Sequence, residues 1–272
     1  MTTVKKTAVR KRVTKPAPKV KPKATKPTIS GRKPGQVSSL KGVLFGPPKT
    51  GKTSLACSGS NVLLISFDPD GDATETLKGR DDITVVEPRT FKEIEEIIKA
   101  LHTTDAARFD WVVLDSLTFL FQLLGGKELT EVFMANKDVR RAYGKAGAAV
   151  SSIIHDLVLL RDTNVIFTAH LSKESEEDTI DLDTRLGETQ VKLAVTPMVW
   201  KILGPAVSFI GRTYKRNESV KGPDGKRNKQ TVYRVSFDDG DRSPAGARLP
   251  LQAEYESTGT TLKEIAEEIL GG

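Results

Sequence analysis

The chain has 272 residues and a formal net charge of +7, with 28% charged and 38% hydrophobic residues. This length is enough to bury a core in one large domain or two small ones. No run approaches eighteen apolar residues and the N-terminus has no apolar signal core, so we expect no membrane span and a cytoplasmic location. The single cysteine, Cys57, excludes an internal disulfide, and we expect it to pack against the sheet without a chemical role.

The basic charge is concentrated in residues 1–38. This segment holds twelve Lys or Arg, five prolines and no acidic residue, and subtracting its +12 from +7 leaves −5 for the other 234 residues. Without a helical or strand period it cannot bury enough apolar surface to fold, so we predict a disordered tail followed by one domain over residues 39–272. Two interpretations stay open for the tail: a solubilising leader, or an arm that binds nucleic acid in a salt-dependent way.

A glycine-rich loop follows the first predicted strand, residues 42–45. Glycines at this spacing let consecutive backbone N–H groups turn around phosphates, and a helix expected at residues 54–58 would aim its positive N-terminus at them. Lys52 would neutralise phosphate charge, and Thr53 would offer its hydroxyl to Mg²⁺. The predicted nucleotide-binding residues are Gly46, Pro47, Pro48, Lys49, Thr50, Gly51, Lys52, Thr53 and Ser54.

The second predicted strand, residues 61–67, runs into the acidic turn of residues 68–72. A carboxylate at the C-terminal end of a strand beside a phosphate loop is placed to orient an attacking water. Asp68 is the first choice for this catalytic group, with Asp70 and Glu75 as alternatives. An acidic turn without a catalytic function is the other interpretation.

A further predicted strand, residues 109–115, ends in Asp115, after a strand at 83–86 and an amphipathic helix at 90–101. In a β/α chain with a phosphate loop, such a strand-tip Asp holds the water shell of the Mg²⁺ that bridges the nucleotide phosphates. Residues 117–161 are predicted to be helical, with an interruption at Gly125 and Gly126.

The strand predicted at residues 164–170 ends in His170, which could sense the γ-phosphate at the nucleotide site. A core or capping histidine is the alternative. The charged loop at 171–187 is predicted to act as a lid.

The C-terminal part of the chain is predicted to contain a helix at 196–203, a strand at 207–214, a β-hairpin and a final helix at 261–270. The sequence Gly-Pro-Asp-Gly provides the turn signal of the hairpin, and alternation resumes at residues 231–237. A basic hairpin can simply aid solubility, but on an otherwise acidic domain it is also a candidate nucleic-acid contact. Its basic residues are Lys215, Arg216, Lys221, Lys226, Arg227 and Lys229.

Taken together, these motifs resemble the RecA/RadA-type P-loop ATPase core, over residues 40 to about 240. The resemblance rests on the loop at 46–53, the acid after the second strand, Trp-Val-Val-Leu-Asp115-Ser116, the polar strand tip at His170 and the C-terminal hairpin. In length and layout the chain looks closest to short RecA-core proteins of bacteriophages that are implicated in single-strand annealing and recombination. The implied fold class is α/β: a RecA-like P-loop NTPase with a mostly parallel central sheet flanked by helices, a C-terminal β-hairpin and a disordered basic N-terminal tail.

The resemblance also implies functions for individual residues. Lys52 and Thr53 would bind ATP and Mg²⁺, Asp115 would hold the metal, Asp68 would stand where the family has a catalytic Glu, and His170 would take the sensor position. The loop after His170 would match a DNA-binding loop. Two departures affect this transfer: Asp68 is one methylene shorter than Glu, and the loop after His170 is acidic.

The implied function is ATP binding and hydrolysis by a phage protein that binds single-stranded DNA and promotes annealing or homologous recombination. A homo-oligomer, as a ring or a filament, and a single-strand binding protein are open as further partners, and no membrane is expected. The alternative is a nucleotide-switched regulator or assembly factor that acts on a protein partner. A small-molecule kinase is disfavoured, because no Arg-rich lid segment follows the central strands.

Overall fold

The computed structural model describes residues 38–68, 71–103, 108–134, 139–172, 192–221, 227–238, 244–248, 251–257 and 261–270. Several predictions therefore lie outside the described residues: the basic tail apart from Ser38, the alternative carboxylate Asp70, most of the loop after His170, and the turn of the C-terminal hairpin.

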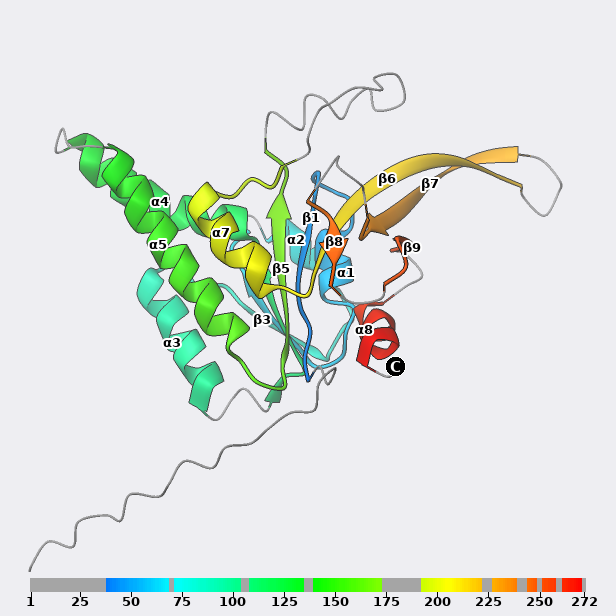
Figure 1. Cartoon of the computed structure of the whole chain (residues 1–272), viewed down its shortest axis with the longest axis horizontal. Helices are drawn as coiled ribbons and strands as arrows, with labels where there is room; N and C mark the ends of the chain where they lie inside the picture. The colour runs from blue at the N-terminus through cyan, green and yellow to red at the C-terminus, as the bar shows by residue number, and fades with distance from the viewer. Residues whose placement is uncertain are drawn as a thin grey trace, which may run out of the picture. The chain divides into compact units, whose positions relative to one another are not determined.

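One mixed sheet is the centre of the fold, and the described residues contribute nine strands to it (Figure 1). Its order is β3-β2-β4-β5-β1-β6-β7-β9, with β8 paired to β6. The neighbours from β3 to β6 are all parallel, whereas β7, β8 and β9 add antiparallel pairs. The strands are β1 Lys41–Gly46, β2 Val62–Ser66, β3 Ile83–Val86, β4 Trp111–Asp115, β5 Asn164–His170, β6 Phe209–Lys221, β7 Arg227–Ser236, β8 Gly246–Ala247 and β9 Glu254–Glu256.

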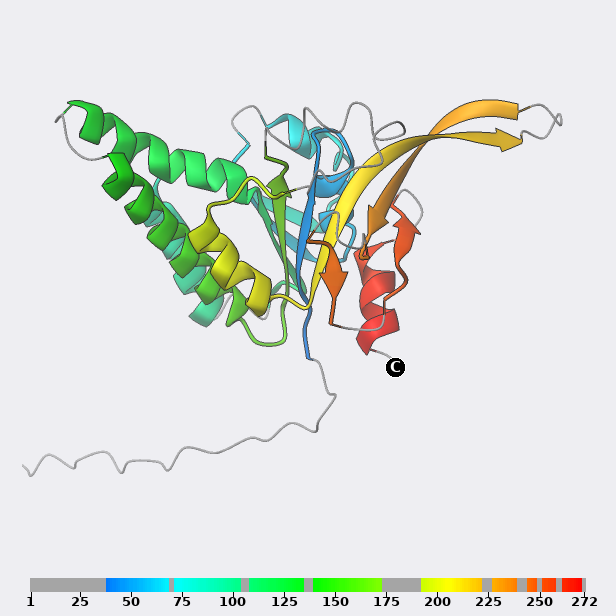
Figure 2. The ribbon, with the colours of Figure 1, turned by 45° about the horizontal axis from the view of Figure 1, so that its top comes forward.

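Helices cover both faces of this sheet (Figure 2). Helices α3, α4, α5 and α7 pack on one face, and α1 and α8 pack on the other. None of the helices in the described part of the chain is both long and apolar enough to cross a membrane. The helices are α1 Lys52–Ala56, α2 Asp72–Glu75, α3 Phe91–Thr103, α4 Leu117–Met134, α5 Val139–Val158, α7 Pro197–Ala206 and α8 Leu262–Leu270.

The central strands are apolar on both faces, which explains their continuous hydrophobic runs. In β1, Val43 and Phe45 join the core beneath α5, while Leu44 points into the core beneath α1. The same alternation divides β2, β4 and β5 between the two cores. Because every residue of β1, β2 and β4 is buried, these strands form a rigid base for the loops at their ends.

Two element predictions are wrong in detail. No interruption occurs at Gly125 and Gly126, because α4 continues through both to Met134. A Cβ at Gly125 would lie 3.8 Å from the Cβ of Ala146, so Gly125 faces α5 where the two helices pack. The strand predicted at 207–214 is too short, since β6 continues to Lys221 in cross-strand pairing with β7. The strands at 83–86 and 164–170 are confirmed with the predicted bounds.

Candidate nucleotide and metal site

The predicted site residues come from strands that end at one edge of the sheet. In the strand register Gly46 of β1 is paired with His170 of β5, and Ser66 of β2 is paired with Asp115 of β4. All four strands are parallel, so the phosphate loop, the acidic turn after β2, Asp115 and His170 lie along the same carboxyl edge. This is where ligands bind in open α/β sheets.

The loop between β1 and α1 needs glycine at two positions. A Cβ on Gly46 would lie 2.2 Å from the backbone oxygen of Thr213, and Gly51 has a φ of 81°. Lys49 also has a positive φ, of 60°, so the chain turns sharply twice within the loop. Pro47 and Pro48 have no N–H group and can only shape the loop, so backbone donors begin at Lys49.

The helix after the loop is too short for its dipole to bind an anion at the N-terminus. It begins at Lys52 and has five residues, not starting at Ser54 as predicted. Ser54 is exposed, and its hydroxyl donates to Thr76 Oγ1 at 3.2 Å. The capacity of this region to bind an anion therefore rests on the loop N–H groups and on the side chain of Lys52.

Lys52 lies folded back over the loop and is 6% exposed. Its Nζ donates to the backbone oxygens of Gly46 at 3.0 Å and Pro47 at 2.7 Å. Both acceptors belong to the loop itself, so the ammonium group is held at the concave side of the turn. A cation held there can neutralise an anion that the loop binds.

Thr53 and Asp115 form the candidate metal site. Thr53 Oγ1 donates to Asp115 Oδ2 at 2.5 Å, joining residues that are 62 positions apart in the chain. The other carboxylate oxygen, Oδ1, accepts a hydrogen bond from Thr168 Oγ1 on β5. Asp115 is almost fully buried, so two hydroxyl groups fix the orientation of a carboxylate that has little contact with solvent. The peptide bond between Asp115 and Ser116 is cis.

The donor atoms of this pair suit Mg²⁺. A hydroxyl and a carboxylate are hard oxygen ligands, and Mg²⁺ commonly takes only one or two protein ligands beside phosphates and water. No cluster of three or more His, Cys, Asp or Glu that could hold a metal by itself occurs in the described ranges. The candidate ligands thus fit a metal that is bound together with a nucleotide.

His170 lies within electrostatic range of Lys52, Asp115 and Asp68. Burial lowers the pKa of His170, and the Lys52 cation lowers it further, while the charges of Asp115 and Asp68 raise it. The ring is therefore neutral at neutral pH. Its position is fixed by a backbone N–H bond to Thr118 Oγ1 at 3.1 Å and by an edge-on contact with Phe119, whose centroid lies 5.3 Å away.

The candidate catalytic carboxylates differ in their surroundings. Asp68 is half-buried directly after β2, and its N–H donates to Ser66 Oγ at 3.3 Å. Glu75, on α2, is exposed and lies 4.0 Å from the ammonium group of Lys78. Of these two carboxylates, Asp68 is the one whose charge acts on His170, at the edge of the sheet that also carries Asp115.

Three hydroxyl groups of the site were missed in the sequence. Thr168 orients Asp115, Thr118 fixes the backbone of His170, and Thr213 Oγ1 lies 2.8 Å from Thr50 Oγ1 in the phosphate loop. Thr168 and Thr213 are fully buried. For Thr168 and Thr213, the sequence offered only a threonine inside a strand as a sign of a buried hydroxyl. That sign is uninformative, because threonine also favours strands for steric reasons.

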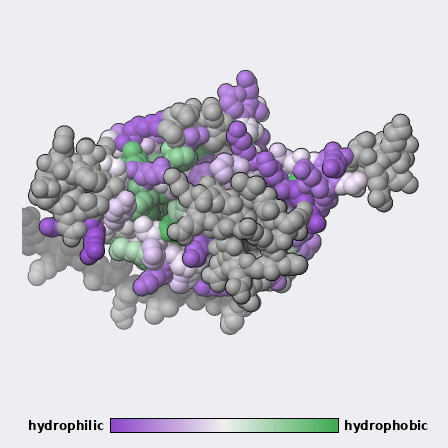
Figure 3. Space-filling model, turned by 90° about the horizontal axis from the view of Figure 1, so that it is seen from above, coloured by the Kyte–Doolittle hydropathy of each residue, from purple (hydrophilic) through white to green (hydrophobic). Residues whose placement is uncertain are grey.

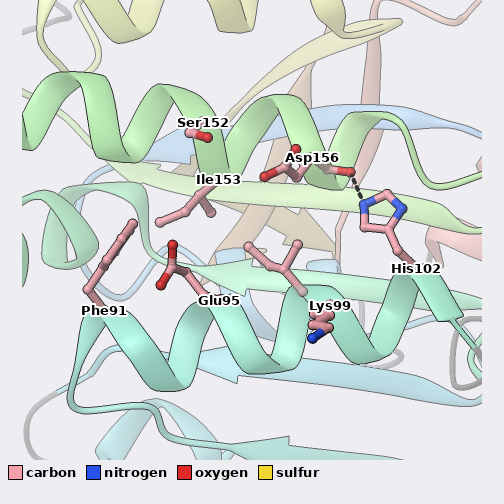
Figure 4. A pocket seen from close by; sticks show the side chains of 8 residues that line it. Phe91, Glu95, Lys99, His102, Ser152, Ile153 and Asp156 are labelled. Atoms are coloured by element: carbon pink, nitrogen blue, oxygen red, sulfur yellow. Dashed lines mark hydrogen bonds between the residues drawn. The ribbon is translucent and has the colours of Figure 1, made fainter.

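Two further features lie apart from this edge. Burial, with a smaller contribution from Asp115, raises the pKa of Cys57 to about 12, which agrees with the packing function expected for this residue. A cavity of about 370 Å³ lies between α3 and α5, where His102 Nε2 is 2.9 Å from the backbone oxygen of Asp156 (Figure 4). Its walls contain none of the predicted site residues.

A family model described as an AAA domain matches residues 38–249. No curated protein gives a match to the sequence. The fold prediction is confirmed by the sheet itself: the domain is a RecA-like P-loop α/β fold with a mostly parallel sheet flanked by helices.

Two solved structures are similar to the chain at low identity. The RadB recombinase is 18% identical with a TM-score of 0.38, and the match covers 72% of this chain and 79% of that protein. The flagellar accessory protein FlaH from Methanocaldococcus jannaschii is 11% identical with a TM-score of 0.35, and the match covers 79% of this chain and 83% of that protein. At these values neither protein indicates what this chain binds.

Proposed function

The chain belongs to the AAA domain family, and from this premise we propose that it is a RecA-like ATPase that binds single-stranded DNA and acts in annealing or recombination. The nucleotide part of this proposal is carried by one observation. The hydroxyl of Thr53 at the start of α1 and the strand-tip carboxylate of Asp115 meet at 2.5 Å, beside the loop whose backbone oxygens bind Lys52. The proposal includes a phage origin and a cytoplasmic location.

The residues divide the work of ATP hydrolysis between them. The N–H groups of the loop and the ammonium group of Lys52 bind the phosphates. Thr53 and Asp115 would hold Mg²⁺, which would neutralise phosphate charge when bound. Thr168 keeps the Asp115 carboxylate turned toward Thr53.

Asp68 and His170 complete the proposed mechanism. The Asp68 carboxylate orients the attacking water and accepts its proton. The neutral ring of His170 contacts the γ-phosphate and passes its presence to the segment that follows β5. Asp68 is a short carboxylate for this work, so slow hydrolysis is expected.

The DNA part of the proposal rests on charge. The tail of residues 1–38 carries twelve basic residues and no acid, and the C-terminal hairpin carries further basic residues. Lysine and arginine side chains bind the nucleic-acid backbone by releasing counterions, so the affinity should fall as salt rises.

Two measurements on the full chain test this function. Phosphate release with ATP and Mg²⁺, with and without oligo-dT, should show slow hydrolysis that DNA stimulates. Fluorescence anisotropy of labelled oligo-dT should show binding at 50 mM salt that weakens by 200 mM. Absence of DNA binding at low salt would contradict the recombination function. If ATP were still bound, that result would favour the nucleotide-switched regulator, which the net acidic charge outside the tail also favours.

A further inference from the structure

The hairpin of β6 and β7 extends beyond the sheet as a two-stranded ribbon (Figures 1 and 2). β6 pairs with β1 only up to Arg212, and β9 pairs with β7 only from Arg234 to Ser236. From Lys215 and Tyr233 outward, the described register contains only β6 and β7. Such a ribbon contributes little to folding, and Lys215, Arg216 and Lys229 are exposed along it and available for binding.

The two faces of this ribbon carry different charges. Directly opposed residues share a face, and the three pairs from Lys215 and Tyr233 to Ser219 and Lys229 define what we call the lysine face. The three alternate pairs, from Tyr214 and Arg234 to Glu218 and Gln230, define the arginine face. The lysine face consists of Lys215, Asn217, Ser219, Lys229, Thr231 and Tyr233, and the arginine face of Tyr214, Arg216, Glu218, Gln230, Val232 and Arg234.

The arginine face is neutralised by its own carboxylates. Arg234 donates to Glu218 Oε1 through Nε at 3.0 Å and through Nη2 at 2.9 Å, and its Nη1 lies 3.6 Å from Glu254 Oε2. Glu256 stands opposite Arg234 in the register with β9. Two arginines and three carboxylates therefore share this side of the ribbon, which leaves little attraction for a polyanion.

The lysine face has a different composition. Lys215 and Lys229 are exposed, and the described residues of this face include no carboxylate. Tyr233 is half-buried opposite Lys215, and Thr231 Oγ1 donates to Asn217 Oδ1 at 3.0 Å between the two lysines. Cations, neutral polar groups and one aromatic ring are what a sequence-tolerant nucleic-acid surface contains. Seen from above, the described part of the hairpin surface is mainly hydrophilic (Figure 3).

We propose that the lysine face of the β6–β7 hairpin is a contact surface for single-stranded DNA, in which Lys215 and Lys229 bind phosphates and Tyr233 stacks on a base. This inference rests on the proposed function and assigns its DNA contact to one face of one ribbon. Lys229 is opposite Ser219, four residues along the strand from Tyr233. Lys215 is directly opposite Tyr233, so one cation lies beside the aromatic ring and the second lies nearer the tip of the ribbon.

The charge test compares neighbouring residues on opposite faces in the full chain. Lys215→Gln and Arg216→Gln each remove one exposed charge from adjacent positions of β6, and Lys215→Gln with Lys229→Gln removes both lysines. Anisotropy of labelled oligo-dT is measured between 50 and 200 mM salt. We expect the double variant to bind roughly tenfold more weakly, with a log–log salt slope shallower by about 1.4, and Arg216→Gln to match the wild type.

The stacking test uses Tyr233→Leu and Tyr233→Phe. Leu keeps apolar bulk without an aromatic ring, so its affinity should fall roughly 5- to 100-fold, while Phe keeps the wild-type affinity. A wild-type rate of ATP hydrolysis without DNA would show that each variant is folded.

The outcomes distinguish a failure of this inference from a failure of the proposed function on which it rests. If the wild type binds oligo-dT and the lysine variants bind equally well, the assignment to this face is wrong and the proposed function stands. Equal losses for Lys215→Gln and Arg216→Gln would also overturn it. A wild type that binds ATP but no DNA removes both the inference and the DNA part of the proposed function.

Discussion

Two buried lysines lie near opposite ends of β1, Lys41 as its first residue and Lys52 after the loop that follows it, and their ammonium groups are bound in nearly the same way. Lys41 is 7% exposed and Lys52 is 6% exposed. Lys41 Nζ donates to the backbone oxygens of Leu160 at 2.9 Å and Thr163 at 2.5 Å, and Lys52 Nζ donates to two loop oxygens at 3.0 and 2.7 Å. Burial and hydrogen bonds alone thus do not distinguish a structural lysine from a functional one.

The surroundings make the distinction. Lys41 begins β1 at the amino edge of the sheet, where burial lowers its pKa to about 8 and only Asp162 opposes that shift. Lys52 shares its edge with a loop of backbone donors, a hydroxyl–carboxylate pair and a neutral histidine. A buried cation is a binding group when further groups for the same ligand converge on it.

The largest expected effect is the difference in ATP binding and hydrolysis between the methionine variants of the two lysines. Methionine keeps the side-chain stem and removes the charge. Lys52→Met should reduce ATP binding and hydrolysis by about 100-fold or more, because the phosphates lose their cation. Lys41→Met should hydrolyse ATP at the wild-type rate. Phosphate release and binding of a fluorescent ATP analogue measure both effects.

Thermal unfolding without nucleotide is the control for this pair of variants. Both should unfold cooperatively, so that a loss of activity reports on the site. Normal hydrolysis by Lys52→Met would show that the phosphate-binding assignment is wrong.

The next largest effect is expected from Asp115→Asn, which changes charge at almost constant shape. The amide can still accept the hydrogen bond from Thr53 but binds a divalent cation poorly, so hydrolysis should fall by about 100-fold and require more Mg²⁺. The rate measured against Mg²⁺ concentration checks this. An unchanged Mg²⁺ profile would remove Asp115 from the metal site.

At the amino edge the expected effect is on stability and depends on pH. Lys41 has a pKa of about 8 in the folded chain, against 10.5 normally. Between these two pH values the unfolded state binds more protons than the folded state. The free energy of unfolding therefore rises with pH from about 8 to about 10.5. Relative to Lys41→Met, the wild type should gain about 2 kcal/mol between pH 7.5 and 9.5. Urea unfolding of both proteins at the two values measures it, and a constant difference would contradict the buried-cation interpretation.

The smallest effect is expected from Thr168→Val, which removes the hydroxyl that orients Asp115 and preserves the shape of β5. Hydrolysis should fall about tenfold, since one charge-assisted hydrogen bond is lost. Thr168→Ser should restore most of the rate, because it keeps the hydroxyl. Equal rates for the Val and Ser variants would show that the hydroxyl does not position the carboxylate.

The sequence was informative where residue spacing has a chemical reason. The glycine spacing of the loop and the apolar strand before Asp115 predicted which groups would meet, and Thr53 and Asp115 do meet in the structure. The strand at 164–170 was predictable because a mostly apolar run is typical of a buried parallel strand.

The sequence was uninformative where tertiary contact decides. A lysine before an apolar strand looks exposed, and only the packing of residues 160–163 against the start of β1 buries Lys41. The pairing of Thr213 with Thr50 joins residues 163 positions apart, which no local pattern indicates. The hairpin strands were predicted too short because their many charged residues are typical of a loop. Only the cross-strand register shows that these residues alternate between the two faces of a ribbon.

The burial of Cys57 has a practical consequence for experiments on this protein. With its pKa raised to about 12, the only thiol of the chain is protonated at neutral pH and shielded from maleimide reagents. A cysteine introduced at an exposed position would then be the single site of labelling, and the native residue would not need to be removed. A fluorophore attached in this way would report on the molecule from one known location.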